Sequence, residues 1–182
     1  MTQLHLPLTE SGRKVIIPTT LPVLFLAGPI RNAPKWQDAL IKELFPKQES
    51  IFIASPTREL SKEMMIHTEP DKDDYQTVKR QRAWEQYYMN QASESGCILF
   101  WLPEEASPKE HPEKIYAHIT MMELGLWIAR KKLNPNLNIV IGTDKKFPEW
   151  STIKFELDTE VPSIPISYSI TETIENALEL IK

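Results

Sequence analysis

Short, continuously apolar segments alternate along this chain with longer segments of helical periodicity. The apolar segments are PVLFLAG (22–28), SIFIAS (50–55), CILFWL (97–102) and LNIVIG (137–142). Strands with so few polar residues are typical of parallel sheets that helices cover on both faces. With right-handed crossover connections, the pattern predicts an α/β, doubly wound, mainly parallel five-stranded sheet.

The intervening segments predict helices, because their apolar residues recur at helical spacing. The predicted helices span residues 33–45, 73–95, 116–132 and 170–182. In the third of them, Ile119, Met122, Leu126 and Ala129 form one apolar stripe.

Two further segments favour extended structure. SIPISYS (163–169) predicts the last short strand, and TIKFEL (152–157) predicts a strand or an edge hairpin. Residues 1–21 form a poorly patterned lead-in. We expect residues 1–182 to form a single domain.

The composition excludes several classes of function. The 182 residues carry a net charge of −4, from 25 acidic and 21 basic residues, so the chain lacks the basic excess of nucleic-acid-binding proteins. No run approaches the ~20 apolar residues of a membrane-spanning helix. The N-terminus also lacks the apolar core of a signal peptide, and we therefore expect a cytoplasmic protein without membrane contact.

The residues that usually bind cofactors and metals are sparse. Five glycines cannot build a dinucleotide fingerprint or a phosphate-binding P-loop. Four histidines without ligand-like spacing suggest no metal site, and no cofactor is expected. The single cysteine, Cys97, lies in an apolar run, which predicts a buried, inert thiol.

In doubly wound sheets the ligand crevice lies beyond the C-terminal ends of the strands. This rule selects the segments after Ala27, Ala54, Leu102 and Gly142. The first holds Gly28, Pro29 and Arg31, which could contact a ligand or form a plain strand-to-helix turn. In the second, Arg58 is either a ligand contact or an ion-pair partner. The third, a long loop over 103–118 with several prolines, is of the kind that forms lids.

That loop leads into AHITMMELGLWIA (117–129), an apolar helical run with one acid, Glu123. Glu123 could be a solvent-facing helical glutamate or a functional carboxylate near the strand ends. Thr120 lies three residues earlier, on the same helix face. A glycine inside a helix usually has a packing reason, so we expect Gly125 to pack closely on the sheet.

A second acid, Glu85, lies in QRAWEQYY on the preceding helix. The neighbouring Trp84, Tyr87 and Tyr88 could stack on purine or pyrimidine rings. Packing in the core explains these aromatic residues equally well.

Several short motifs, taken together and in order, resemble the nucleoside 2-deoxyribosyltransferase-like family. They are FLAGPI (25–30), PTREL (56–60), QRAWE (81–85), ILFWLP (98–103) and ITMMELG (119–125). The resemblance extends from about Val23 to Gly142 and implies a flavodoxin-like fold. It also implies a homo-oligomer, because family members complete their sites across an interface.

The resemblance implies that Glu123 is a carboxylate nucleophile and that Glu85 handles the proton of the base. It implies that Gly28, Pro29 and Arg31 hold the sugar or its phosphate. The activity it implies is cleavage of the N-glycosidic bond of a 2-deoxynucleoside through a covalent glutamyl-deoxyribosyl intermediate, with transfer of the sugar to another base. A deoxynucleoside or nucleotide N-glycoside hydrolase and a non-catalytic nucleotide-ligand sensor are the alternatives.

Overall fold

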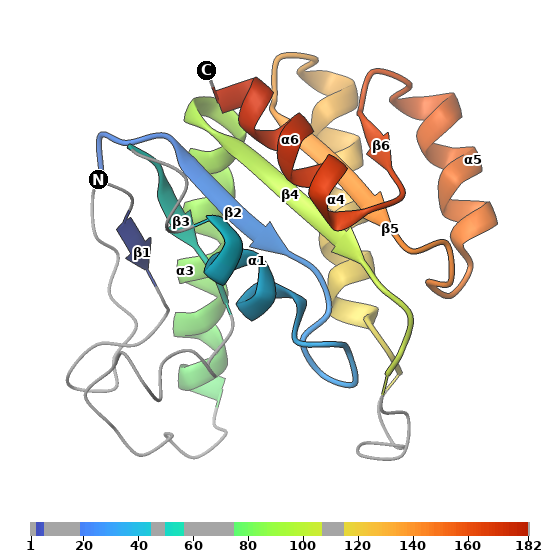
Figure 1. Ribbon diagram of the computed structural model, residues 1–182, viewed down its shortest axis with the longest axis horizontal. Helices are drawn as coiled ribbons and strands as arrows, with labels where there is room; N and C mark the ends of the chain where they lie inside the picture. Colours follow the sequence, from blue (N-terminus) through green and yellow to red (C-terminus); the bar gives the residue numbers. More distant parts are fainter. Residues whose placement is uncertain (1–2, 6–18, 45–49, 57–74, 107–114, 182) are drawn as a thin grey trace.

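The described residues form an all-parallel, six-stranded sheet in the order β1-β3-β2-β4-β5-β6 (Figure 1). The computed structural model describes residues 3–5, 19–44, 50–56, 75–106 and 115–181. The strands are β1 (Gln3–His5), β2 (Val23–Ala27), β3 (Phe52–Ala54), β4 (Cys97–Leu102), β5 (Ile139–Thr143) and β6 (Ile166–Ser167). The last five have the flavodoxin-like order, in which the first strand lies between the second and the third.

Helices cover both faces of this sheet, which confirms the predicted doubly wound α/β architecture. They are α1 (Trp36–Leu44), α3 (Tyr75–Ser95), α4 (His118–Leu133), α5 (Trp150–Glu160) and α6 (Ile170–Ile181). One core layer holds side chains of α3, α4 and α5, and the other holds side chains of α1 and α6. The lead-in contributes β1, which pairs with β3 at the sheet edge.

The strand or hairpin predicted for residues 152–157 is wrong, because this segment lies within α5. Trp150, Ile153 and Leu157 are its buried residues, at the spacing of one helix face. The β-branched Thr152–Ile153 pair favoured a strand, but packing of this face on the sheet decides the structure.

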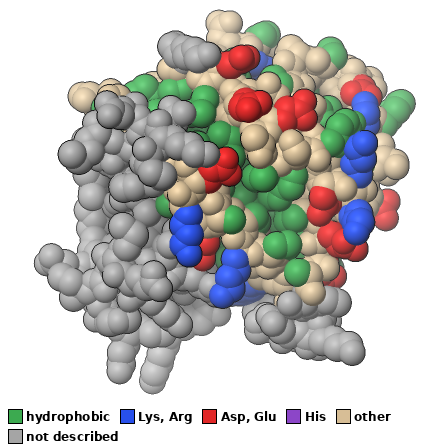
Figure 2. All heavy atoms as spheres, viewed as in Figure 1, with side chains coloured by type: hydrophobic (Ala, Val, Ile, Leu, Met, Phe, Trp, Pro, Cys, Tyr) green, Lys and Arg blue, Asp and Glu red, His purple; other side chains and the backbone are tan. Residues whose placement is uncertain are grey.

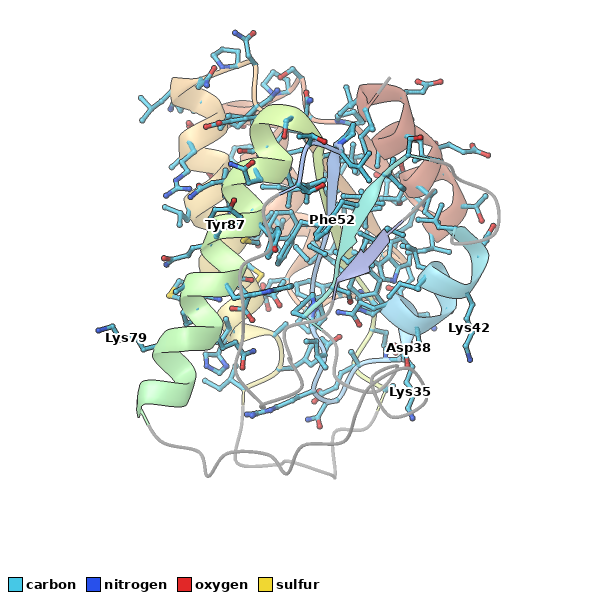
Figure 3. All side chains as sticks on the ribbon, turned by 90° about the vertical axis from the view of Figure 1, so that its left-hand side faces the viewer. Lys35, Asp38, Lys42, Phe52, Lys79 and Tyr87 are labelled. Atoms are coloured by element: carbon cyan, nitrogen blue, oxygen red, sulfur yellow. The ribbon has the colours of Figure 1, made fainter. Side chains whose placement is uncertain are left out.

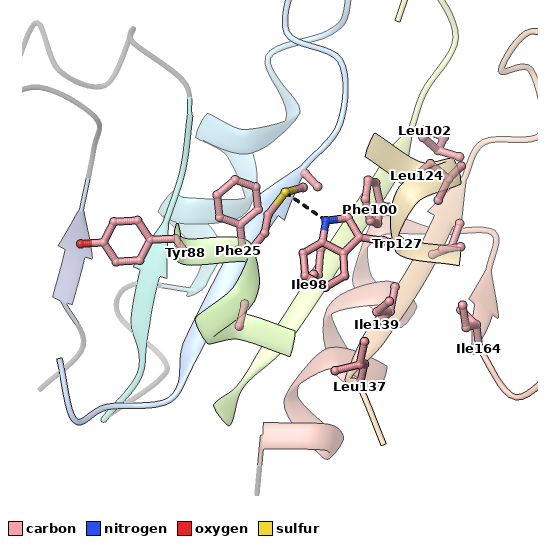
Figure 4. Packing of buried hydrophobic residues seen from close by; sticks show 14 of the residues in the cluster. Phe25, Tyr88, Ile98, Phe100, Leu102, Leu124, Trp127, Leu137, Ile139 and Ile164 are labelled. Atoms are coloured by element: carbon pink, nitrogen blue, oxygen red, sulfur yellow. Dashed lines mark hydrogen bonds between the residues drawn. The ribbon is translucent and has the colours of Figure 1, made fainter. Parts of the chain in front are cut away.

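The core layer between the sheet and helices α3–α5 is rich in aromatic side chains (Figure 4). Trp127 of α4 donates a hydrogen bond from its indole Nε1 to the Met89 sulfur of α3, at 3.3 Å. The Phe52 ring of β3 stacks on Tyr88, with ring centroids 5.5 Å apart. Helices α3 and α4 are thus fixed against the same strands and against each other.

The opposite layer is smaller, and α1 lies across the sheet from α3 (Figure 3). Asp38 and Lys42 lie on α1, and Lys35 directly precedes it (Figure 3). On this face of the molecule, the described Lys and Arg side chains are interspersed with Asp and Glu (Figure 2). Cys97 is fully buried here as predicted, and burial raises the pKa of its thiol well above the usual value.

All strands run in the same direction, so their C-terminal ends share one edge of the sheet. The chain switches faces between β2 and β4, since α1 follows β2 on one side and α4 follows β4 on the other. Such a switch point is where doubly wound sheets bind ligands. Among the helices the structure describes, none has the length and apolarity to cross a membrane.

Candidate active site at the C-terminal edge of the sheet

The segments that follow β2, β4 and β5 are hydrogen-bonded to one another at the switch point. Asn32, after β2, donates from Nδ2 to Glu105 Oε1 at 2.9 Å, and the Ala106 N–H donates to the Asn32 carbonyl at 2.6 Å. On the other side, the Glu104 N–H donates to Asp144 Oδ2 at 2.8 Å. The segment after β4 is therefore held from both sides.

Tyr116 connects the two ends of the long loop between β4 and α4. Its hydroxyl donates to the Pro103 carbonyl at 2.9 Å. The middle of this loop, residues 107–114, lies outside the described residues. The entry to α4 is therefore anchored to the end of β4.

Two glutamates from different helices meet on the face of the sheet that α3 and α4 cover. Counted over the whole residue, Glu123 of α4 and Glu85 of α3 are 9% and 7% exposed. Both carboxylates accept hydrogen bonds from one atom, Nη1 of Arg82: Glu85 Oε2 at 2.6 Å and Glu123 Oε1 in a short contact. The structure thus brings together the two predicted catalytic acids through a cation that the sequence analysis did not name.

Helix geometry explains the position of Glu85. Its neighbour Trp84 faces the sheet and is 1% exposed, so Glu85 projects one residue further around α3. Arg82 and Gln81 precede it by three and four residues, on the same helix surface. Gln81 Nε2 donates to Glu85 Oε1 at 2.9 Å, so both Glu85 oxygens accept hydrogen bonds.

On α4 the buried face consists of Thr120, Glu123, Leu124 and Trp127. The apolar stripe that the sequence suggested points outward instead: Ile119, Met122 and Leu126 are 44%, 59% and 45% exposed. The acid therefore lies on the inner side of the helix. A carboxylate there must be compensated, and Arg82 supplies the compensating charge.

The expectation for Gly125 is wrong. A Cβ built at this position would meet no atom within 4 Å, and the residue is exposed. Leu124 and Trp127 make the contact with the sheet instead. Gly125 therefore does not serve close packing of α4 in this chain.

Burial raises the pKa of the Glu123 carboxyl above its usual value. The hydrogen bond and positive charge of Arg82 oppose this rise, while the negative charge of Glu85 adds to it. Burial lowers the pKa of Arg82, but its bonds to both carboxylates outweigh burial and raise it overall. The arginine is therefore a permanent cation between two acids.

The predicted binding residues after β2 have largely structural surroundings. A Cβ at Gly28 would lie 2.4 Å from the Trp101 carbonyl oxygen, and the Pro29 carbonyl accepts a 3.0 Å bond from Trp36 Nε1. Arg31 is exposed. Arg58 lies outside the described residues.

Trp84 and Tyr88 are 1% and 0% exposed within the core layer of α3–α5. Their rings pack on each other, with centroids 4.9 Å apart. Neither ring has an exposed face on which a base could stack, so the structure favours the core-packing alternative. Thr120, by contrast, shares the buried face of α4 with Glu123.

Polar residues near the switch point were missed by the sequence analysis. Asn32, in the segment after β2, and Gln37, in α1, are 6% and 2% exposed. Among the described residues, Asn32 Oδ1 and Gln37 Nε2 are buried without a hydrogen-bond partner, an arrangement that native proteins rarely leave unexplained. Arg82 had a local signal, because it lies three residues before Glu85 in RAWE.

Two sets of polar groups are available: an anionic pair with its guanidinium on α3 and α4, and the two buried amides after β2 and on α1. Within the described part of the chain, His, Cys, Asp and Glu side chains form no cluster of three or more that could hold a metal. Two buried carboxylates in unequal surroundings can divide the roles of nucleophile and proton carrier. The arrangement suits acid–base and covalent chemistry at an electrophilic carbon.

Comparison with known proteins gives one match. A family model described as nucleoside 2-deoxyribosyltransferase like matches residues 22–135, more than half of the chain. The matched region extends from the start of β2 to just beyond α4 and so includes Arg82, Glu85 and Glu123. Among curated proteins, none matches this sequence.

Proposed function

The chain belongs to the nucleoside 2-deoxyribosyltransferase-like family, and we propose that it cleaves the N-glycosidic bond of a 2-deoxynucleoside and passes the sugar to another base. Glu123 is the nucleophile in this proposal, and Glu85 carries the proton. The observation that carries the proposal is the buried pair of Glu123 and Glu85, joined by Arg82 behind the C-terminal edge of the sheet.

The proposed reaction has two balanced halves. In the first, a Glu123 oxygen bonds to the anomeric carbon, the bond from that carbon to the base nitrogen breaks, and its electron pair stays on the nitrogen. A protonated Glu85 gives its proton to that nitrogen. In the second, an incoming base attacks the same carbon, the ester to Glu123 breaks, and ionised Glu85 takes the proton of the incoming base.

A carboxylate suits this step because the transition state resembles an oxocarbenium ion, whose positive charge the anion stabilises. A 2-deoxy sugar lacks the electron-withdrawing 2-hydroxyl and forms this state more readily. In the structure both Glu85 oxygens accept hydrogen bonds, from Gln81 and Arg82. To carry a proton, Glu85 therefore gives up the bond from Gln81 when substrate binds.

Buried amides at the switch point support recognition of a polar ligand. Asn32 Oδ1 can accept from a sugar hydroxyl or an exocyclic amine, and Gln37 Nε2 can donate to an oxygen. Asn32 directly follows Gly28, Pro29 and Arg31, the residues that the family resemblance matches to sugar contacts, and Gln37 lies further on, in α1. These amides take the place of Pro29, whose contacts are structural.

The proposal is tested by incubating the protein with each natural deoxynucleoside, with and without a free acceptor base, and analysing the products. We expect base exchange that falls by at least about 10³-fold in Glu123→Gln, in the range seen when a single catalytic group is removed. Glu156→Gln, an exposed glutamate on α5, is the matched control and keeps full activity.

Other outcomes distinguish the alternatives. Free base and free deoxyribose, without exchange, would identify a hydrolase that uses the same nucleophile. Tight binding of a nucleotide without any turnover would identify a sensor and overturn the enzyme proposal. Equal activity of Glu123→Gln and wild type would also overturn it.

A further inference from the structure

Arg82 has an unusual position, since one of its nitrogen atoms serves two acids on two helices. Its bond to Glu85 spans three residues of α3, and its bond to Glu123 connects residues 41 positions apart. The first is set by the helix itself, and the second depends on how α3 and α4 pack. Arg82 therefore couples the local geometry of α3 to the acid on α4.

The charges around Glu123 do not balance without this arginine. The side chains of Glu85 and Glu123 are 9% and 11% exposed, and that of Arg82 is 25% exposed. Of the charged side chains in the described residues, Arg82 and Glu85 are those that act on Glu123, with opposite signs. Two buried carboxylates without a cation share a proton, because both cannot ionise at close range.

The bonding pattern also orients Glu123. Arg82 engages Oε1. Arg82 is the hydrogen-bond partner of Glu123 among the described residues, and none of them donates to Oε2. Within the described part of the chain, Arg82 thus fixes one oxygen of the carboxylate and leaves Oε2 without a donor. A nucleophile needs such a fixed orientation, because it must approach the carbon from one direction.

We propose that Arg82 is a positioning residue that keeps Glu123 ionised and oriented for attack while Glu85 remains beside it. The claim that Arg82 orients a nucleophile rests on the proposed function. The claim that Arg82 keeps Glu123 ionised concerns the protein without substrate and can be tested separately. Without Arg82, the negative charge of Glu85 acts on Glu123 without compensation, so Glu123 takes up a proton more readily and loses its nucleophilic form. Of the described cations, Arg82 is the one that acts on Glu123, and we expect lysine to be a poor substitute because an ammonium keeps the charge but holds a carboxylate less rigidly.

The test follows the titration of Glu123 in the protein without substrate by carbon NMR. The carboxyl signal of Glu123 is identified as the one that disappears in Glu123→Gln. In Arg82→Gln we expect the titration midpoint to rise by roughly 1–3 pH units. The double variant Arg82→Gln/Glu85→Gln should bring it back toward wild type, because the repelling charge is gone. Arg130→Gln, which removes an arginine of α4 that bonds to Asn90, is the matched control and leaves the midpoint unchanged.

The pH dependence of kcat/KM gives a second readout that a merely structural residue would not move. In Arg82→Gln the acidic limb of this profile should move to higher pH by as much as the Glu123 titration midpoint rises. The value of kcat/KM should recover at higher pH. Arg82→Lys should keep the limb near its wild-type position and lower kcat. If Arg82→Gln does not fold, Arg82→Lys and the double variant carry the test.

The outcomes separate this inference from the proposed function. A raised Glu123 midpoint in a protein without turnover would support the role of Arg82 and overturn the enzyme proposal alone. An unchanged midpoint in folded Arg82→Gln, or a double variant that fails to reverse the rise, would overturn the role of Arg82 whatever the activity.

Discussion

Gly28 at the end of β2 lies so close to Trp101 of β4 that a Cβ there would be 2.4 Å from the Trp101 carbonyl oxygen. Gly28 also has a backbone φ of +150°, which residues other than glycine rarely adopt. The glycine lets two neighbouring strands end side by side at the switch point. The close approach of these strand ends shapes the edge where the candidate site lies.

We expect Gly28→Ala to lower the free energy of unfolding by roughly 2–4 kcal/mol, because backbone strain and a clash with a backbone oxygen add. Urea unfolding followed by circular dichroism measures the change. A loss below about 0.5 kcal/mol would show that the strand ends can separate at little cost.

Gly125→Ala should change the free energy of unfolding in the opposite direction to Gly28→Ala. Gly125 lies inside α4 and has open space where a Cβ would be, so alanine adds helix propensity without a clash. We expect a gain of about 1 kcal/mol in the free energy of unfolding, measured in the same urea experiment. A loss of stability would mean that another molecule packs on this position.

The layered fold could be predicted because burial on both faces leaves a direct mark on the sequence. A strand such as CILFWL is apolar at every position, and all six of its residues are buried. The helix α5 was misread because its apolar residues are few and lie among β-branched ones. Short segments of this kind fit both periods, and the packing of Trp150 and Leu157 decides between them.

The two acids of the site were predicted from the sequence, but the cation between them and the inward orientation of Glu123 on α4 were not. Apolar periodicity favours Ile119, Met122 and Leu126 as the inner face, yet Glu123 lies inside. A buried acid becomes stable only through Arg82, which is 41 residues away in the chain. No local pattern reports such a partner, so the orientation of α4 required the structure.

Trp84 offers a test of whether the aromatic residues of α3 stabilise the core or bind substrate. At 1% exposure, its replacement by alanine should cost about 3–5 kcal/mol of unfolding free energy. The control is Lys79→Ala, an exposed residue of the same helix that points away from the sheet (Figure 3), with an expected change within about 0.5 kcal/mol. A Trp84→Ala protein of normal stability with a raised KM would restore the base-stacking role.

The raised pKa of Glu123 makes a prediction about stability and pH. Burial raises the pKa of this carboxyl above the ordinary glutamate value of about 4.3 that the unfolded chain has. Between the two values the folded protein holds a proton that the unfolded chain has lost. Stability contributed by this group is therefore present below about pH 4.3 and decreases as pH rises through the folded pKa.

Glu123→Gln removes this titration, so wild type should lose stability relative to the variant as pH rises across that window. The relative loss should level off above the folded pKa, at about 1.4 kcal/mol for each pKa unit between the two states. Urea unfolding of both proteins at several pH values between about 4 and 8 measures the difference. Glu156→Gln, exposed on α5, should show a flat difference. A wild type that gains stability over Glu123→Gln with rising pH would mean that Arg82 outweighs burial and lowers the pKa of Glu123.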